Sequence, residues 1–162
     1  MKKVLVLLIV ALSFSFVGKA QTGFVGGGLT LFFSDGLLYQ STIHGGYEFN
    51  DKIAVMAMVG IAAIGQDRYS YVSGTTGSYL RYTTWHNNVI YLDLKPAIEI
   101  AFTDYISVAD IAVVPSMRFR CSTHWEVFSD IGAFGVRYME GVWSPRIGFS
   151  NITAVMGVNY RF

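Results

Sequence analysis

The sequence predicts an all-β fold, specifically an eight-stranded antiparallel up-and-down transmembrane β-barrel. Hydrophobic residues make up 52% of the 162-residue chain and charged residues only 14%. After the first 20 residues the longest strongly apolar stretch, 53–65, is shorter than the roughly 20 residues that a spanning helix needs. Apolar and polar residues instead alternate with a period of two, which is typical of strands whose two faces meet different surroundings.

The N-terminal segment 1–20 has the layout of a secretory signal peptide. Lys2 and Lys3 precede the apolar run 4–17, and the small residue Ala20 stands at the expected cleavage site. An uncleaved membrane anchor is the alternative, but the run is short for a spanning helix. We therefore expect a cleaved leader at 1–20 and one barrel domain at 21–162.

Charge and cysteine content limit the classes of function. Removing Lys2, Lys3 and Lys19 with the leader leaves 9 of the 12 basic residues against 11 acidic ones. This small negative balance gives no reason to expect nucleic-acid binding. Cys121 is the only cysteine, so no intramolecular disulfide can form. We expect its thiol to be buried or to face lipid rather than to be reactive.

The alternation is clearest in the segments 37–49, 90–100, 117–127 and 151–162, where apolar side chains occupy one face. A repeated signature of phenylalanine, a small polar residue and aspartate marks expected turns at Asp35, Asp51, Asp104 and Asp130. Together these patterns predict eight strands, an even number as in single-chain bacterial barrels. The predicted strands are approximately 23–33, 37–49, 53–72, 78–101, 105–113, 117–128, 131–143 and 150–162.

A topology follows if both termini are periplasmic. Turns near 51, 103 and 129 are then expected on the periplasmic side, and the connections near 35, 73–77, 114–116 and 144–149 face outward. The segment 73–77 is expected to tip the longest hairpin. An aromatic girdle is expected at the periplasmic strand ends, formed by Tyr47, Phe49, Phe102, Phe128, Tyr160 and Phe162.

Two places depart from the alternation. The segment 53–64 is apolar on both faces, and Asp110 shares the parity of Ile106 and Val108. A charge that faced lipid near the midplane would cost a few kcal/mol. We therefore expect Asp110 to lie near a rim, or a β-bulge to reset the register.

The same parities place a network of charged side chains in the barrel lumen, with four acids and five bases. An eight-stranded barrel is only just wide enough for side chains to fill, and buried charges must be paired or hydrated. A salt-bridged plug is the favoured interpretation, and a narrow gated pore is the alternative. The predicted network is Glu48, Asp93, Lys95, Glu99, Arg118, Arg120, Glu126, Arg137 and Arg161.

No catalytic or metal site is predicted, and no cofactor is expected. The three histidines, His44, His86 and His124, fall on different predicted strands. Ser122, His124 and Glu126 share one face, but alternate residues of a strand are about 7 Å apart, too far for the direct hydrogen bonds of a triad. We therefore expect no enzymatic activity. An enzyme that modifies outer-membrane lipid stays open as an alternative.

The C-terminus carries an expected assembly signal. Gly157 is followed at fixed spacing by Tyr160 and the terminal Phe162. This ending looks like the terminal-strand signal by which outer-membrane barrels are recognised for assembly. With the segments 46–55 and 96–108, it makes the chain resemble the small porin-like outer-membrane β-barrel family, with members of OmpA/OmpX-type size, that is frequent in Bacteroidota.

The resemblance implies an integral protein of the cell envelope of a Gram-negative bacterium, located in the outer membrane and crossing it with transmembrane β-strands. It implies outer-membrane lipids, the barrel-assembly machinery and periplasmic chaperones as partners. The expected role is non-enzymatic: envelope structure, surface interaction or a narrow pore. A secreted soluble β-barrel that carries an apolar ligand is a further alternative.

Overall fold

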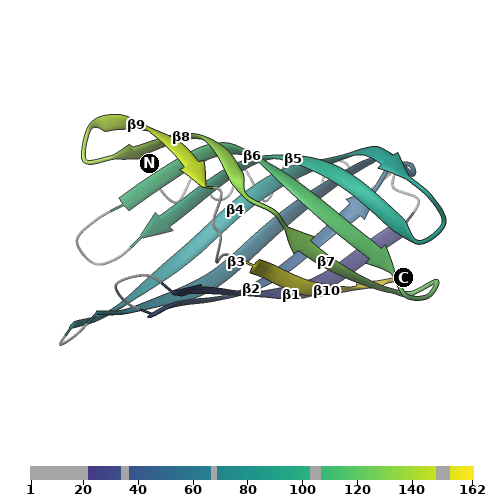
Figure 1. Cartoon of the computed structure of the whole chain (residues 1–162), viewed down its shortest axis with the longest axis horizontal. Coiled ribbons are helices and arrows are strands. Elements are labelled where there is room, and N and C mark those ends of the chain that lie inside the picture. Colours follow the sequence, from purple (N-terminus) through teal and green to yellow (C-terminus); the bar gives the residue numbers. More distant parts are fainter. Residues whose placement is uncertain (1–21, 34–36, 67–68, 103–106, 149–153) are drawn as a thin grey trace.

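The computed structural model describes residues 22–33, 37–66, 69–102, 107–148 and 154–162. The predicted leader 1–20 lies outside these residues. Ten strands run obliquely along the long axis of the molecule (Figure 1). They are β1 (Thr22–Phe33), β2 (Leu37–Glu48), β3 (Ile53–Gln66), β4 (Tyr69–His86), β5 (Ile90–Phe102), β6 (Ser107–Arg120), β7 (Trp125–Asp130), β8 (Ala133–Met139), β9 (Val142–Gly148) and β10 (Ala154–Arg161).

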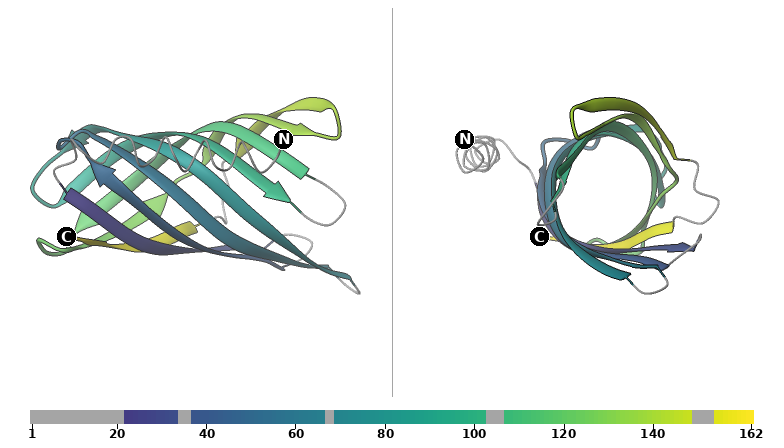
Figure 2. Two further views of the ribbon diagram at one scale, coloured as in Figure 1. Left: turned by 180° about the vertical axis from the view of Figure 1, so that it is seen from behind. Right: turned by 90° about the vertical axis from the view of Figure 1, so that its left-hand side faces the viewer.

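The strands close into a barrel. Antiparallel pairings run in the order β5-β4-β3-β2-β1-β10-β7-β6, and β6 pairs back to β5. Among the described residues this ring holds eight strands. Figure 2 shows the barrel end-on, with the strands arranged around its axis. β8 continues from β7 along β6, and β9 pairs with β8. The predicted all-β, eight-stranded antiparallel barrel is therefore confirmed.

The two ends of the barrel differ in their connections. The turns 49–52, 87–89 and 121–124 lie at the end where Phe162 lies, marked C in Figure 1, which we call the C-terminal end. The opposite, far end carries the β8–β9 turn at Glu140 and Gly141, both with positive φ angles. The strand ends that flank 34–36, 67–68 and 103–106 also lie at the far end.

Several predicted turns were wrong. Residues 73–77 lie inside β4, residues 114–116 lie inside β6, and Ser129 belongs to β7. The strand ends beside 103–106 lie at the far end instead of the end that holds the C-terminus. Phe102 therefore lies at the opposite end from the expected girdle, and Phe128 is buried in the interior.

The turns at the C-terminal end are capped by side chains. The Oδ1 atom of Asn87 accepts hydrogen bonds from the backbone N–H groups of Val89 (2.8 Å) and Ile90 (2.7 Å). Asn50 makes the same pair of bonds in the β2–β3 turn. In the β6–β7 turn, Ser122 Oγ accepts from the backbone N–H of Trp125 at 3.1 Å. The signal for the turn at 87–89 was therefore present in the sequence as an asparagine.

A break separates β7 from β8 at Ile131 and Gly132. Opposite it stands Pro115 of β6, which has no N–H to donate to the ladder. Its carbonyl accepts a hydrogen bond from Ile131 N–H at 2.8 Å. The pairings Val113↔Phe134 and Ser116↔Asp130 enclose one more residue on this strand than on β6. The break is therefore a β-bulge.

Side chains alternate between the two faces as predicted. In β6, Asp110, Ala112, Val114, Ser116 and Arg118 are buried. Asp110 therefore points inward on the same parity as Arg118, whereas the sequence alternation gave it the parity of Ile106 and Val108. It lies close to the far end of β6, as the expectation of a position near a rim requires. The register of β6 on β5 is continuous from Ser107 to Phe119.

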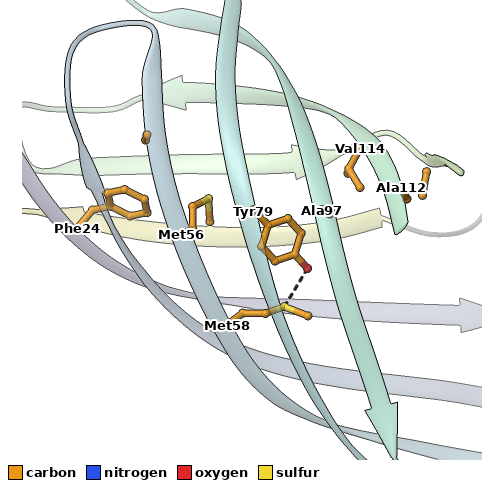
Figure 3. Packing of buried hydrophobic residues seen from close by; sticks show 9 residues of the cluster. Phe24, Met56, Met58, Tyr79, Ala97, Ala112 and Val114 are labelled. Atoms are coloured by element: carbon orange, nitrogen blue, oxygen red, sulfur yellow. Dashed lines mark hydrogen bonds between the residues drawn. The ribbon is translucent and has the colours of Figure 1, made fainter. Parts of the chain in front are cut away.

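The segment 53–62 also alternates, although both of its faces are apolar. Ala54, Met56 and Met58 are buried inside the barrel, whereas Val59 and Ile61 are about 60% exposed. The apolar inward side chains pack with Phe24 and Tyr79, and the Tyr79 hydroxyl lies 3.0 Å from Met58 Sδ (Figure 3). Part of the interior is thus an ordinary apolar core.

In the described part of the chain, no helix has the length and hydropathy needed to cross a bilayer.

Glycines make room for the inward aromatic rings. A Cβ atom on Gly157 would overlap the ring of Phe128, so we expect Gly157→Val to lower the free energy of unfolding by about 1–3 kcal/mol through overpacking. Gly45→Val is the control, because a Cβ there meets only ordinary contacts, the nearest at 3.5 Å. Urea unfolding in detergent micelles measures the free energy of unfolding of both variants. Equal stability of the two variants would contradict this packing.

Candidate functional site in the barrel interior

All nine charged residues of the predicted lumen network take part in ion pairs in the structure. Four additional residues, Arg81, Asp110, Asp130 and Arg146, join them. The pairs fall into three groups along the barrel: one near the C-terminal end, one in the middle and one at the far end. The interior is therefore the candidate functional site, and its chemistry is that of paired charges.

Arg118 of β6 is the centre of the group near the C-terminal end. Its Nε donates to Asp93 at 2.5 Å, and its Nη1 donates to Glu126 at 2.9 Å. The guanidinium carbon lies 4.8 Å from the ring centroid of Tyr91, a cation–π distance. The side chain of Arg118 is 3% exposed, and those of Asp93 and Glu126 are 0% and 1% exposed. Such buried charges require partners on all sides.

Glu48 of β2 connects the opposite wall to this group. It accepts hydrogen bonds from Arg81 of β4 and from Arg161 of β10. The Glu126 carboxylate also accepts a hydrogen bond from Arg120 at 3.2 Å, and it lies 3.6 Å from Arg161 Nε. Residues from β2, β4, β5, β6, β7 and β10 are thereby tied across the lumen. Pairs that cross the lumen fix the register of strands that do not touch each other.

The middle group contains Lys95, Asp130 and His44. Lys95 Nζ is bonded to Asp130 and lies 5.1 Å above the ring of Phe128. His44 Nε2 lies 2.6 Å from Asn159 Oδ1, and its ring meets Phe128 edge-on at 5.4 Å. The Phe128 ring thus contacts the Lys95 ammonium group on one side and the His44 imidazole on another.

The far-end group is more open to solvent. Arg137 forms a bidentate pair with Asp110, at 2.8 and 3.0 Å. Arg146 bridges Asp110 at 2.7 Å and Glu99 at 3.3 Å. The side chain of Arg137 is 43% exposed and that of Arg146 is 27% exposed. Solvent screening makes these pairs weaker than the buried ones.

The additional residues were missed for identifiable reasons. Arg81 has the inward parity of Tyr79 and Thr83, but no inward or outward faces were predicted for this part of β4. Asp130 and Arg146 were placed in connections, whereas both lie on strands. Asp110 was placed on the outward face. Applying the parity of Arg118 to the whole of β6 would have found Asp110.

The side chains of the two inner groups leave a small space between them. A cavity of about 10 Å³ remains in the middle, lined by residues that include Arg81, Asp93, Lys95, Arg118 and Asn159. This volume is at the lower limit for one ordered water molecule. The site can therefore hold a small bound species, but the cavity is much too small for an organic substrate.

The histidines do not assemble a catalytic set with the residues considered from sequence. His124 lies on the exposed β6–β7 turn, stacks on Tyr160 at 5.7 Å and bonds Thr123 at 2.9 Å. Glu126 points into the lumen toward arginines. His86 stacks on Tyr91 at 5.2 Å. Among the described residues, no group of three or more His, Cys, Asp or Glu side chains could hold a metal ion.

The residues of the expected assembly signal lie on the last strand and at its end. Gly157 faces inward against Phe128, whereas Tyr160 and Phe162 face outward. Phe162 and Gly23 exchange backbone hydrogen bonds of 2.9 and 3.1 Å. Phe162 therefore extends the seam between β1 and β10 to the last residue of the chain. Cys121 is exposed on the β6–β7 turn, so its thiol is not buried.

Removal of one buried charge tests the network. We expect Glu126→Gln to lower the free energy of unfolding by about 3 kcal/mol or more, because it leaves buried arginines without their counter-charge. Glu140→Gln, at the exposed tip of the β8–β9 hairpin, should change it by less than about 0.5 kcal/mol. Urea unfolding in micelles gives both values. A similar small effect of the two substitutions would show that the buried pairs do not stabilise the barrel.

Comparison with known proteins adds one structural likeness. No protein-family model matches the chain, and no curated protein matches its sequence. Among solved structures it is similar to Ail, the attachment invasion locus protein of Yersinia pestis, with 12% sequence identity and a TM-score of 0.49. The alignment covers 87% of this chain and 98% of that chain. The fold that the resemblance to small porin-like barrels implies is present here through the chain's own strand pairing, which closes a ring of eight antiparallel strands.

Proposed function

We propose that the chain is a non-enzymatic integral protein of the bacterial outer membrane, with an envelope-structural or surface-interaction role. One observation carries this proposal: the barrel is apolar outside and charged inside. The cost of placing charges inside a protein is met by pairing them. Large apolar side chains that face outward all round a closed barrel are stable where lipid surrounds them.

The outward surface supports a membrane setting in detail. Large apolar residues are exposed on every strand of the ring, whereas soluble monomeric proteins rarely expose large contiguous apolar patches. Examples along the wall are Leu29, Ile43, Val59, Val72, Ile98, Ile111, Val127 and Val158. Each of the eight strands of the closed ring also pairs with a neighbour on both sides, as a lipid environment requires.

Aromatic side chains gather toward both ends of this surface. Near the C-terminal end, Trp125 meets Tyr160 at 5.1 Å, and Trp85 is half exposed. On the β8–β9 hairpin, Tyr138 meets Trp143 at 5.0 Å. Aromatic rings favour the two membrane–water interfaces. Two such clusters at opposite ends match an aromatic girdle better than a ligand-stacking site.

The interior argues against the other candidates. A soluble carrier of an apolar ligand would need a large apolar cavity, whereas the cavity described in the middle of this barrel is small and has four charged side chains in its lining. A pore would need a continuous channel, but Arg118, Glu48 and Glu126 meet across the lumen. A lipid-modifying enzyme would need a nucleophile with a base, and Glu126 is engaged with arginines. A sealed structural barrel fits these contacts best.

The proposed partners follow from the proposed location. Outer-membrane lipids would contact the apolar wall. The barrel-assembly machinery and periplasmic chaperones would handle the exported chain, with Gly157, Tyr160 and Phe162 as the terminal signal. The C-terminal end would then face the periplasm, and the β8–β9 hairpin would face outward as the part available to a surface partner.

Location and barrel stability are tested together. We expect the protein in the outer-membrane fraction after export, with a mobility in electrophoresis that differs between heated and unheated samples. A closed barrel resists detergent until it is heated, and this produces the shift. Recovery as a soluble monomer without detergent, and without a mobility shift, would overturn the membrane proposal.

An arginine introduced on the outer face of the barrel tests whether lipid or water surrounds that face. Ile43 is 65% exposed and lies midway along β2. We expect Ile43→Arg to cost about 2–4 kcal/mol in unfolding from lipid vesicles, since the guanidinium would face hydrocarbon. Asn88→Arg, on the exposed turn at 87–89, is the control and should be near neutral. A tolerated arginine at both positions would place water, not lipid, outside the barrel.

The sealed interior predicts an absence of conductance. In planar bilayers the reconstituted protein should give no stable ion-conducting steps, because paired side chains fill the lumen. Glu126→Gln supplies a comparison in which the seal is weakened. Regular conductance steps from the unchanged protein would favour the narrow-pore role instead.

A further inference from the structure

His44 of β2 is a buried titratable side chain whose hydrogen-bond partner is an amide and not a carboxylate. The residue is 5% exposed, and its Nε2 atom lies 2.6 Å from Asn159 Oδ1 of β10. Because a carbonyl oxygen can only accept, the imidazole donates this bond. Gly26 of β1 makes room for the contact, since a Cβ atom there would lie 2.3 Å from Asn159 Oδ1 and 2.7 Å from His44 Nε2. The lumen is therefore shaped around an imidazole that is bonded to an amide.

The side chains around His44 offer no free acid to a charged imidazole. Its cross-strand neighbours on β1 and β3 are a glycine and a methionine. The charged side chains that act on it come from three other strands: Lys95 of β5, Arg81 of β4 and Asp130 of β7. The Asp130 carboxylate is bonded to Lys95, so its charge is already compensated. Within the described part of the chain, a positive charge on His44 would therefore have no counter-charge of its own.

The ion pairs of the inner groups are balanced while His44 is neutral. Arg120, whose side chain is 26% exposed, lies partly in solvent. The other charged side chains of the described inner groups are four cations and four anions: Arg81, Lys95, Arg118 and Arg161 with Glu48, Asp93, Glu126 and Asp130. A proton on His44 would add one positive charge to this balanced interior. Such a buried charge is costly unless it is paired.

We propose that the contact between His44 and Asn159 is a pH-sensitive element of the closed barrel. An imidazole in water takes up a proton near about pH 6.5. The unfolded chain exposes His44 to water and binds this proton freely, whereas the folded lumen can bind it only by accepting an unpaired charge. Because the unfolded state then holds more protons, the folded barrel loses stability as the pH falls below about 6.5. Above that pH, the neutral imidazole joins β2 to β10.

The first test is thermal unfolding of the full barrel in zwitterionic detergent at about pH 7.5 and about pH 5.5, a range above the titration of ordinary carboxylates. We expect the midpoint temperature to be lower by about 4 °C at the acidic pH. In His44→Gln the side chain keeps an N–H group for Asn159 but cannot become charged, so the difference should fall to about 1 °C or less. An equal difference in the two proteins would overturn the proposal.

The other two histidines of the chain separate this site from a general effect of acid. His86 and His124 are both exposed at the C-terminal end of the barrel. His86→Gln and His124→Gln should therefore each keep the full pH difference of the unchanged protein. If either substitution removes the difference, the response does not arise at His44, and the proposal is wrong.

A carboxylate in place of the amide tests the cause of the response, and it keeps the proposal testable if His44→Gln does not fold. Asn159→Asp puts an acid at the position whose oxygen now lies 2.6 Å from His44 Nε2. The charged imidazole then has a partner, so the midpoint temperature should no longer fall between the two pH values. A fall as large as that of the unchanged protein would contradict the proposal. These measurements need only a folded barrel in detergent, so their failure would leave the membrane location, tested by fractionation, unaffected.

Discussion

The inverted distribution of polarity is the constraint on which the rest of the structure depends. Because the wall is apolar outside, nearly every charge in the strands must lie inside a lumen that side chains fill. Charges in so small a volume must be paired. Arg118 meets this requirement by reaching two acids on neighbouring strands, and Glu48 meets it by accepting arginines from β4 and β10. Ion pairing therefore positions the strands as well as neutralising the charges.

The same crowding explains the irregular features of the wall. Gly157 leaves room for Phe128, and that ring in turn supports Lys95 and His44. Pro115 of β6 has no N–H to donate to the hydrogen-bond ladder, and the strand that faces it contains a β-bulge at Ile131 and Gly132. Beyond the bulge, β8 carries Arg137 to Asp110. A local backbone irregularity thus allows one barrel strand to serve two separate ion-pair groups.

The sequence predicted faces better than it predicted turns. Side-chain parity in β5 and β6 was right for Asp93, Lys95, Arg118 and Arg120, because alternation does not depend on where a strand ends. Turn positions follow no such regular pattern, so their prediction depended on local residue composition. The Gly- and Thr-rich segment 73–77 resembles a loop, yet small residues also suit a crowded barrel wall. Three false turns, at 73–77, 114–116 and 129, were offset by three unpredicted connections, which join β3 to β4, β4 to β5 and β6 to β7. The strand number of the ring therefore stayed correct. The pairing of Arg146 with Glu99 depends on that lost topology and could not be predicted.

The burial of the ion pairs varies along the lumen. The far-end group is partly exposed, and water can screen it. In the inner groups, most of the charged side chains are buried and meet their partners within the chain. A barrel that conducted solutes would hydrate those charges, so they would have less need of partners. Direct pairing across the lumen is therefore the arrangement expected of an interior in which side chains, rather than water, compensate the charges.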